Sequence, residues 1–348
     1  MNAEHNSRDE AWMHRALTLA QKGVGTTSPN PPVGAIIVKN GRVLGEGYHA
    51  KVGRPHAERE AIRHAKEQGN AGELAGSTLY VTLEPCSSHG KTPPCTDAIL
   101  EEGISRVVYG AVDPDKRHRG RADELLRAGG VQVQDRVAEE ACRAFLEPWA
   151  HAITKGRPWV TAKIATTMDG RIARKTERWL SSEESLRYAH QLRLESDAIL
   201  VGGQTVRCDL PALTIRKPLS AIPIIKEQPW RIVMTNDRSK LPLNAPLFTD
   251  ENAERTIVYE RVEDMESMLE ELHSRLGVVR LMLECGGNLL KKFLEKGLVN
   301  EWVQVITPYL SGGETMLIPG GYMPEERQLK SISSVTCGKD VVLRGILT

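Results

Sequence analysis

The stretch Thr82-Leu83-Glu84-Pro85-Cys86 ends a β-rich run, and Thr92-Pro93-Pro94-Cys95 opens a short helical pattern soon after it. Upstream, His56-Ala57-Glu58 opens another helical pattern. A neutral imidazole and two thiolates are the donors of a three-ligand zinc site that keeps a fourth position open for water. Because the three segments occur in order at helix starts or at a strand end, the sequence predicts zinc bound by His56, Cys86 and Cys95.

Glu58, two residues after the histidine, is expected to handle protons rather than to bind metal. Zinc lowers the pKa of a bound water toward ~7, and a nearby carboxylate carries a proton from that water to a leaving amine. The alternative is a chance His-x-Glu match, with the cysteines as apolar filler. The general deaminase signature has two residues between its cysteines. Eight separate them here, which indicates a particular branch of the zinc deaminases.

The segments around these motifs alternate between strand and helix patterns, which is typical of an α/β/α sandwich. Ser7 and Glu10 have the spacing of a capping box and predict that the first helix begins there. Asn40-Gly41 predicts a hairpin turn between two strands. Strands are expected at residues 33–38, 42–47, 78–82, 106–111 and 131–133, and helices at 56–66, 97–102, 124–128 and 138–153.

Lys155-Gly156-Arg157-Pro158 interrupts the last of these helices, so the sequence predicts domains at residues 1–154 and 155–348. A second α/β series follows the break. Its strands are expected at residues 159–165, 198–201, 231–235, 256–259 and 281–283, its helices at 183–194, 263–276 and 288–295, and a long loop at 207–229.

The composition excludes several classes of protein. The 348 residues include 46 basic and 45 acidic side chains, and this balance argues against a nucleic-acid or membrane-surface binder. No stretch approaches the ~20 apolar residues of a membrane helix, and the start lacks the features of a signal peptide. Six cysteines in a chain of this size do not suggest a disulfide framework. We therefore expect a cytoplasmic protein that acts on a small molecule, and a homo-oligomer is compatible with the sequence.

The first half resembles the RibD (RibG) family of bifunctional riboflavin-biosynthesis enzymes. The resemblance lies in Ser28-Pro29-Asn30-Pro31, Val33-Gly34, His56-Ala57-Glu58 and the run from Glu84 to Cys95. It implies a cytidine-deaminase-like domain that acts on diaminohydroxyphosphoribosylaminopyrimidine. The resemblance also implies that Asn30 forms a hydrogen bond with the pyrimidine, that His49 lies near the pyrimidine ring, and that Lys91 contacts the phosphate of the substrate. Asn30 as a simple turn residue and Lys91 as a solvated loop charge are the alternatives.

Two positions in this half differ from the family pattern. Ser88 stands where the family usually has histidine, and Asp115 stands where it usually has asparagine. A carboxylate near a substrate phosphate would repel it. The basic run from Lys116 to Arg119 follows immediately and offers compensation.

The second half contains no Gly-x-Gly-x-x-Gly after a strand, so a Rossmann site is not expected. Gly286-Gly287-Asn288 instead runs from an apolar strand into a helix, which exposes main-chain amides to an anion. A tight turn without a ligand is the alternative. The surrounding segments resemble the RibD reductase domain; they are residues 163–173, 179–181, 190–193, 196–207, 211–216, 307–308 and 312–313.

This resemblance implies a dihydrofolate-reductase-like α/β domain that uses NADPH to reduce the ribosyl group of 5-amino-6-(5-phosphoribosylamino)uracil to ribityl. The cofactor contacts would be Ala165, Trp179, Thr205, Asp209, Asn236, Gly286, Gly287, Asn288, Leu289, Leu290, Lys291 and Lys292. The substrate contacts would be Arg193, Leu213, Arg216 and Glu284, with the two arginines as forked donors to the phosphate. Core packing of Trp179 and a solvated face for the arginines are the alternatives.

Departures in this half leave other functions open. Glu177 takes the place of a serine that would contact substrate, and Leu210 interrupts the usual Asp-Asp-Pro. One alternative is therefore a deaminase with an inactive or repurposed reductase domain. A remote one is a nucleic-acid-editing deaminase, which would need a basic or aromatic groove. A structural zinc site with His89 as fourth ligand would leave Glu58 without a role.

Overall fold

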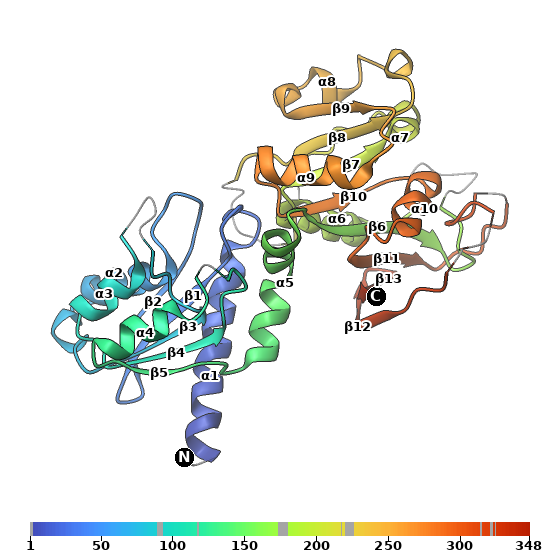
Figure 1. The fold of residues 1–348 in the computed structure, drawn as a ribbon. Helices are drawn as coiled ribbons and strands as arrows, with labels where there is room; N and C mark the ends of the chain where they lie inside the picture. Colours follow the sequence, from blue (N-terminus) through green and yellow to red (C-terminus); the bar gives the residue numbers. More distant parts are fainter. Residues whose placement is uncertain are drawn as a thin grey trace. The chain divides into compact units, whose positions relative to one another are not determined.

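The computed structural model describes residues 3–88, 93–116, 118–172, 180–216, 218–219, 226–313, 315–320, 323 and 325–348. The chain divides into two compact units, Met1–Lys155 and Gly156–Thr348, which are described separately. Figure 1 shows that each unit is built around its own β-sheet.

The first unit contains a five-stranded sheet of order β2-β1-β3-β4-β5. Strand β1 is antiparallel to both β2 and β3, whereas β3, β4 and β5 are parallel. The strands are β1 (Gly34–Lys39), β2 (Arg42–Tyr48), β3 (Thr78–Leu83), β4 (Arg106–Ala111) and β5 (Gln132–Gln134).

Helices cover both faces of this sheet (Figure 1). One face carries α2 (Ala57–Glu67), α3 (Cys95–Glu101) and α4 (Arg121–Ala128), and the other carries α1 (Ala3–Ala20) and α5 (Glu139–Lys155). Short 3-10 turns lie at Gln21–Gly23 and Ala71–Glu73. The predicted α/β/α sandwich is therefore present.

The predicted start of the first helix is wrong, because α1 begins at Ala3 and Ser7 lies inside it. The reason is tertiary. Asp9 is almost fully buried and accepts hydrogen bonds from Tyr80 (2.7 Å) and from both terminal nitrogens of Arg106 (2.6 and 3.1 Å). These bonds tie the first turns of α1 to the sheet and stabilise helix beyond the local capping signal.

The strand directions bring distant segments to one edge of the sheet. Because β1 runs antiparallel to β3, the chain entering β1 and the chain leaving β2 lie at the same edge as the carboxyl ends of β3 and β4. Asn30, His49, Cys86 and Asp113 come from these four places.

The second unit contains an eight-stranded sheet of order β12-β13-β11-β6-β10-β7-β8-β9. The six strands from β11 to β9 in this order are parallel, and β13 and β12 extend the sheet as an antiparallel pair. The strands are β6 (Trp159–Thr167), β7 (Ala198–Gly202), β8 (Trp230–Thr235), β9 (Thr256–Glu260), β10 (Arg280–Leu283), β11 (Glu301–Thr307), β12 (Leu329–Cys337) and β13 (Asp340–Leu347).

The helices of this unit pack on two apolar cores, one on each face. One core includes Leu269 and Phe293, and the other includes Leu192, Val206 and Leu247. The helices are α6 (Glu183–Glu195), α7 (Gly203–Asp209), α8 (Pro246–Thr249), α9 (Met265–Leu276) and α10 (Gly287–Glu295), with 3-10 turns at Arg238–Lys240 and Ala253–Arg255. In the described part of the chain no helix is long and apolar enough to cross a membrane.

Candidate active sites

The three predicted zinc ligands lie together at one edge of the first sheet. His56, Cys86 and Cys95 each offer one ligand atom, and these atoms all lie within 4.8 Å of one another. The Nδ1 atom of His56 is 3.4 Å from Sγ of Cys86 and 3.5 Å from Sγ of Cys95. One imidazole and two sulfurs at this spacing fit a tetrahedral zinc ion with its fourth position open.

Two helix N-termini hold these ligands. His56 is the N-cap of α2, and Cys95 is the first residue of α3. The main-chain amide of Cys95 donates to both the carbonyl (3.1 Å) and the sulfur (3.2 Å) of Cys86. Arg59 donates to the carbonyl of Pro94 (3.0 Å) and so joins the first turn of α2 to the start of α3. The ligand spacing is therefore set by main-chain contacts.

The electrostatics of the cluster favour a bound cation. Hydrogen bonds from Cys95 and His56 hold the pKa of the Cys86 thiol well below its usual range, whereas the contact with Cys86 and burial raise the pKa of Cys95. Helix N-termini also favour thiolates. Burial raises the pKa of Glu58, which is 3% exposed. A divalent ion would relieve the repulsion between a second thiolate and these neighbours.

His49 lies beside the zinc ligand His56, and Asn30 contacts His49. The ring of His49 is 5.4 Å from that of His56, in an edge-to-face arrangement. Nδ1 of His49 is 3.1 Å from the carbonyl of Pro55, which only accepts, so Nδ1 carries the proton. Nε2 then accepts from Nδ2 of Asn30 at 3.2 Å. Burial lowers the pKa of His49 and favours this neutral tautomer.

The two departures from the family pattern are close to each other in space. Oγ of Ser88 lies 3.3 Å from Nδ1 of His118, and the other ring nitrogen of His118 is 4.0 Å from Asp115. Glu84 accepts hydrogen bonds from the amides of Asp113 (3.2 Å) and Ala122 (3.4 Å) and fixes both ends of this loop. The sequence reasoning missed the pairing of Ser88 with His118. Lys91 and His89 lie outside the described residues.

The second unit has a cavity of about 920 Å³ at the carboxyl edge of its parallel strands. Ligands of open α/β sheets bind at this edge. The cavity includes the starts of α7 and α10 and four basic side chains, which are Arg207, Lys240, Lys292 and Lys296. Exposed amides at helix N-termini and nearby cations together suit phosphate groups.

Seven of the predicted cofactor residues line this cavity: Thr205, Asn236, Gly286, Gly287, Asn288, Leu289 and Lys292. Of the remaining predicted contacts, those that the structure describes do not line it. Leu290 is 1% exposed within the core, Ala165 packs against the core on the opposite face, and Lys291 points its amine toward the carbonyl of Pro319 (3.5 Å). Asp209 ends α7 and is exposed, and Trp179 lies outside the described residues, as does Glu177.

Arg193 and Glu284 form a half-buried ion pair. The guanidinium binds both carboxylate oxygens (2.6 and 2.8 Å), and a further nitrogen donates to the carbonyl of Thr214 (3.1 Å). Lys163 is a second half-buried cation near this pair, and the sequence reasoning gave it no role. Its signal was a lysine inside the apolar strand β6. Burial alone would raise the pKa of Glu284, but Arg193 and Lys163 outweigh burial and lower it.

Arg216 and Leu213 lie on the segment that passes this ion pair. Arg216 is exposed, and its guanidinium donates to the hydroxyl of Thr214 (3.1 Å). Its main-chain amide donates to Nδ1 of His190 (3.3 Å). Leu213 is 2% exposed and has a left-handed backbone with φ of 54°. Two guanidinium nitrogens of Arg193 are already bonded to Glu284. Arg216 is exposed, so its guanidinium is the one accessible to a ligand.

Comparison with known proteins identifies both halves of the chain. Residues 158–343 match the RibD C-terminal domain, and residues 6–111 match the cytidine and deoxycytidylate deaminase zinc-binding region. The riboflavin biosynthesis protein RibD of Aquifex aeolicus is 39% identical over an alignment that covers 92% of this chain and 93% of the relative. The chain belongs to the RibD family. The RibD of Escherichia coli is 35% identical over 88% of this chain and 89% of its own.

Solved structures agree with this assignment. RibD of Acinetobacter baumannii superposes with a TM-score of 0.88 at 29% identity and covers 99% of this chain and 100% of its own. A Thermotoga maritima deaminase/reductase superposes with a TM-score of 0.82 at 32% identity, again over 99% of this chain and 100% of its own. The chain is thus a bifunctional enzyme of riboflavin biosynthesis, a zinc-type pyrimidine deaminase and an NADPH-dependent reductase. The expected family, fold class, activities and cofactors are confirmed.

Proposed function

We propose that His56, Cys86 and Cys95 hold the zinc ion for hydrolytic deamination of diaminohydroxyphosphoribosylaminopyrimidine. The observation that carries this proposal is the grouping of one imidazole nitrogen and two sulfurs within 4.8 Å. Zinc, when bound, lowers the pKa of a water so that it attacks the amino-bearing ring carbon at neutral pH. The remaining chemistry belongs to side chains of the chain itself.

Glu58 is the proton carrier in this proposal. Its carboxylate takes a proton from the attacking water and delivers it to the amine, which leaves as ammonia when the carbon–nitrogen bond breaks. Burial raises its pKa above that of a free glutamate, which makes the side chain a stronger base toward the attacking water. Asn30, held by His49, orients the pyrimidine, and Lys91 binds the phosphate.

The substitution Glu58→Gln tests this role, because the amide keeps the shape of the side chain and loses its proton. We expect ammonia release to fall by roughly 10²–10⁴-fold while zinc content, measured by mass spectrometry of the metal, stays at one ion per chain. Reduction of supplied deaminated substrate serves as the control. Deamination within about twofold of the unsubstituted enzyme would rule out the proton-carrier assignment.

For the second unit, we propose that NADPH occupies the cavity at the carboxyl edge of the sheet. NADPH supplies the hydride that reduces the first carbon of the opened ribose. Thr205, Asn236 and residues 286–289 line the cavity, and the amides at the starts of α7 and α10 suit the pyrophosphate. Ala165, Trp179, Asp209 and residues 290–292 complete the proposed set.

The substrate of this second step is proposed to lie over Arg193, Leu213, Arg216 and Glu284. Arg216 is exposed and is the forked donor for its phosphate, whereas Arg193 holds Glu284 in place. We propose that residues 1–154 form the deaminase domain and residues 155–348 the reductase domain. A cytoplasmic location is part of the proposal, and six cysteines without disulfides are compatible with it.

A further inference from the structure

The segment Ala212–Arg216 carries two of the proposed substrate contacts and belongs to no strand or helix. Among the described residues, its main-chain hydrogen bonds are made to side chains rather than to a neighbouring strand. Leu213 also has a left-handed backbone conformation, which persists only where the surroundings enforce it. The position of Arg216 therefore depends on the side chains that hold this segment.

Three charged or aromatic side chains each form a hydrogen bond with one main-chain group of the segment. Arg231 donates to the carbonyl of Ala212 (3.0 Å), Arg193 donates to the carbonyl of Thr214 (3.1 Å), and His190 accepts from the amide of Arg216 (3.3 Å). Arg231 is fully buried and also binds both oxygens of Asp250 (2.7 and 2.9 Å). Arg231 also donates to the carbonyl of Asn252, so its removal would break a buried network of bonds, and Arg231 is part of the fold itself.

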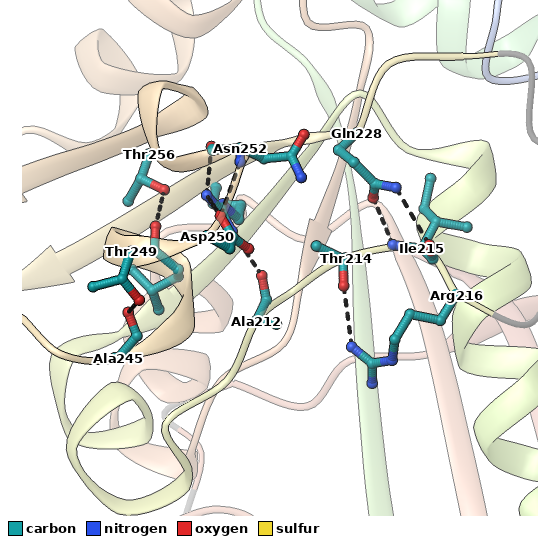
Figure 2. A network of polar contacts seen from close by, with 12 residues as sticks. Ala212, Thr214, Ile215, Arg216, Gln228, Ala245, Thr249, Asp250, Asn252 and Thr256 are labelled. Carbon is teal, nitrogen blue, oxygen red and sulfur yellow. Dashed lines mark hydrogen bonds and ion pairs between the residues drawn. The ribbon is translucent and has the colours of Figure 1, made fainter.

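Gln228 is different, because it is neutral, half-buried and binds both main-chain groups of one residue. The amide of Ile215 donates to its Oε1 (2.6 Å), and its Nε2 donates to the carbonyl of Ile215 (3.3 Å), as Figure 2 shows. This pair of bonds takes the place of a strand neighbour. Figure 2 also shows Arg216 bonded to Thr214 immediately beside this contact.

We propose that Gln228 is a positioning residue of the reductase, which fixes Ile215 and thereby presents Arg216 to the phosphate of the substrate. The inference rests on the proposed substrate site. Arg216 would contact a phosphate remote from the carbon that receives the hydride, so its loss weakens ground state and transition state alike. Loss of the two Gln228 bonds is therefore expected to raise the KM for substrate and to leave kcat and the KM for NADPH nearly unchanged.

The test compares Gln228→Met with Gln228→Glu. Methionine keeps the length of the side chain and makes neither bond, whereas glutamate keeps the acceptor for the Ile215 amide and loses the donor. With 5-amino-6-(5-phosphoribosylamino)uracil as substrate, we expect Gln228→Met to raise KM about tenfold and Gln228→Glu to give an intermediate value. The readout is oxidation of NADPH, with ammonia release by the other domain measured on the same preparations.

The control is Thr256→Val, which removes a hydroxyl bond to the carbonyl of Leu247 (2.6 Å) in the same region without touching the segment (Figure 2). Its KM should match that of the unsubstituted enzyme. An unchanged KM in Gln228→Met would overturn the proposal. A fall in kcat together with a weaker affinity for NADPH in Gln228→Met would also overturn it, because that result indicates a general loss of the native structure of the domain. If the unsubstituted enzyme reduces nothing, the proposed reductase function fails and takes this inference with it.

Discussion

Glu284 is the carboxylate beside two half-buried cations, Arg193 and Lys163. Its carboxylate binds Arg193 through two hydrogen bonds, and it also opposes the effect of burial on Lys163. A fully buried charge that loses its partner destabilises a protein by about 3–5 kcal/mol, and a half-buried pair such as this one belongs at the lower end of that range. The second unit therefore depends on this one side chain for stability as well as for its proposed contact with substrate.

We expect Glu284→Gln to lower the free energy of unfolding of the second unit by about 3 kcal/mol and to reduce NADPH-dependent reduction on the order of 100-fold. Urea unfolding followed by hydrogen exchange of peptides from residues 156–348 measures the first effect, and NADPH oxidation measures the second. Ammonia release, which uses the first unit, should stay unchanged. Full stability in the variant would show that the ion pair contributes nothing net.

His190 gives the second unit a specific dependence on pH. Burial, together with Arg193 and Arg216, lowers the pKa of His190 to about 4, against about 6.5 in an unfolded chain. Between these values the unfolded state binds more protons, so stability falls as the pH drops from 6.5 to 4. Because the ring is only half-buried, the contribution is discounted to about 1–2 kcal/mol.

The variant His190→Gln should lose this contribution. Urea unfolding of the second unit, measured at pH 4.5 and at pH 7, should give a smaller pH difference for the variant by about 1 kcal/mol. Exchange protection of peptides from the first unit provides the reference. Identical pH dependence in the two proteins would show that the native ring is protonated in this range after all.

At the scale of elements, the deaminase site depends on how closely α2 lies against β2. A Cβ atom on Gly47 would meet the main chain of Ala57 and Ala61 at distances that real side chains do not allow. Ala57 begins the helix turn that carries Glu58 and follows the zinc ligand His56. An alanine at position 47 must therefore push this turn away from the other ligands.

We predict that Gly47→Ala lowers the free energy of unfolding of the first unit by about 3 kcal/mol and reduces both zinc content and ammonia release. Gly41→Ala is the matched control, because Gly41 has a positive φ of 75° and open space around it. It should cost only about 1–2 kcal/mol and keep its zinc. The prediction fails if Gly47→Ala binds zinc and releases ammonia like the unsubstituted enzyme.

The sequence predicted most elements that carry a local signal. The hairpin at Asn40-Gly41 and five of the six parallel strands of the second unit, β6 to β10, lie where the patterns indicated. The last three strands, β11, β12 and β13, were missed. In the structure, the side chains of β11 alternate between buried and half-buried. Strand β12 shows no such pattern because most of its side chains are exposed, and its pairing with β13 depends on contacts that a local reading does not contain.

The candidate sites follow the same rule. Motifs with fixed spacing, such as His56 with Glu58, indicated a chemistry from residue types alone. Contacts between distant segments did not, and Gln228 with Ile215 or Ser88 with His118 are examples. Side-chain partners of a loop depend on the packing of the whole unit, so only coordinates reveal them.

At the scale of the whole molecule, the two units carry out different chemistry on related substrates. Each unit has its own sheet, its own buried apolar residues and its own candidate site at a carboxyl edge. Deamination needs zinc and no nicotinamide, whereas reduction needs NADPH. The products formed with and without NADPH therefore separate the two activities in a single preparation.

The most direct test is mass spectrometry of the products that zinc-loaded enzyme forms from diaminohydroxyphosphoribosylaminopyrimidine. Without NADPH we predict the deaminated compound alone, and with NADPH the deaminated compound whose ribosyl group is reduced to ribityl. Deaminated but unreduced product in both samples would contradict the reductase assignment. Unchanged pyrimidine in both samples, with zinc bound, would contradict the account of the deaminase site.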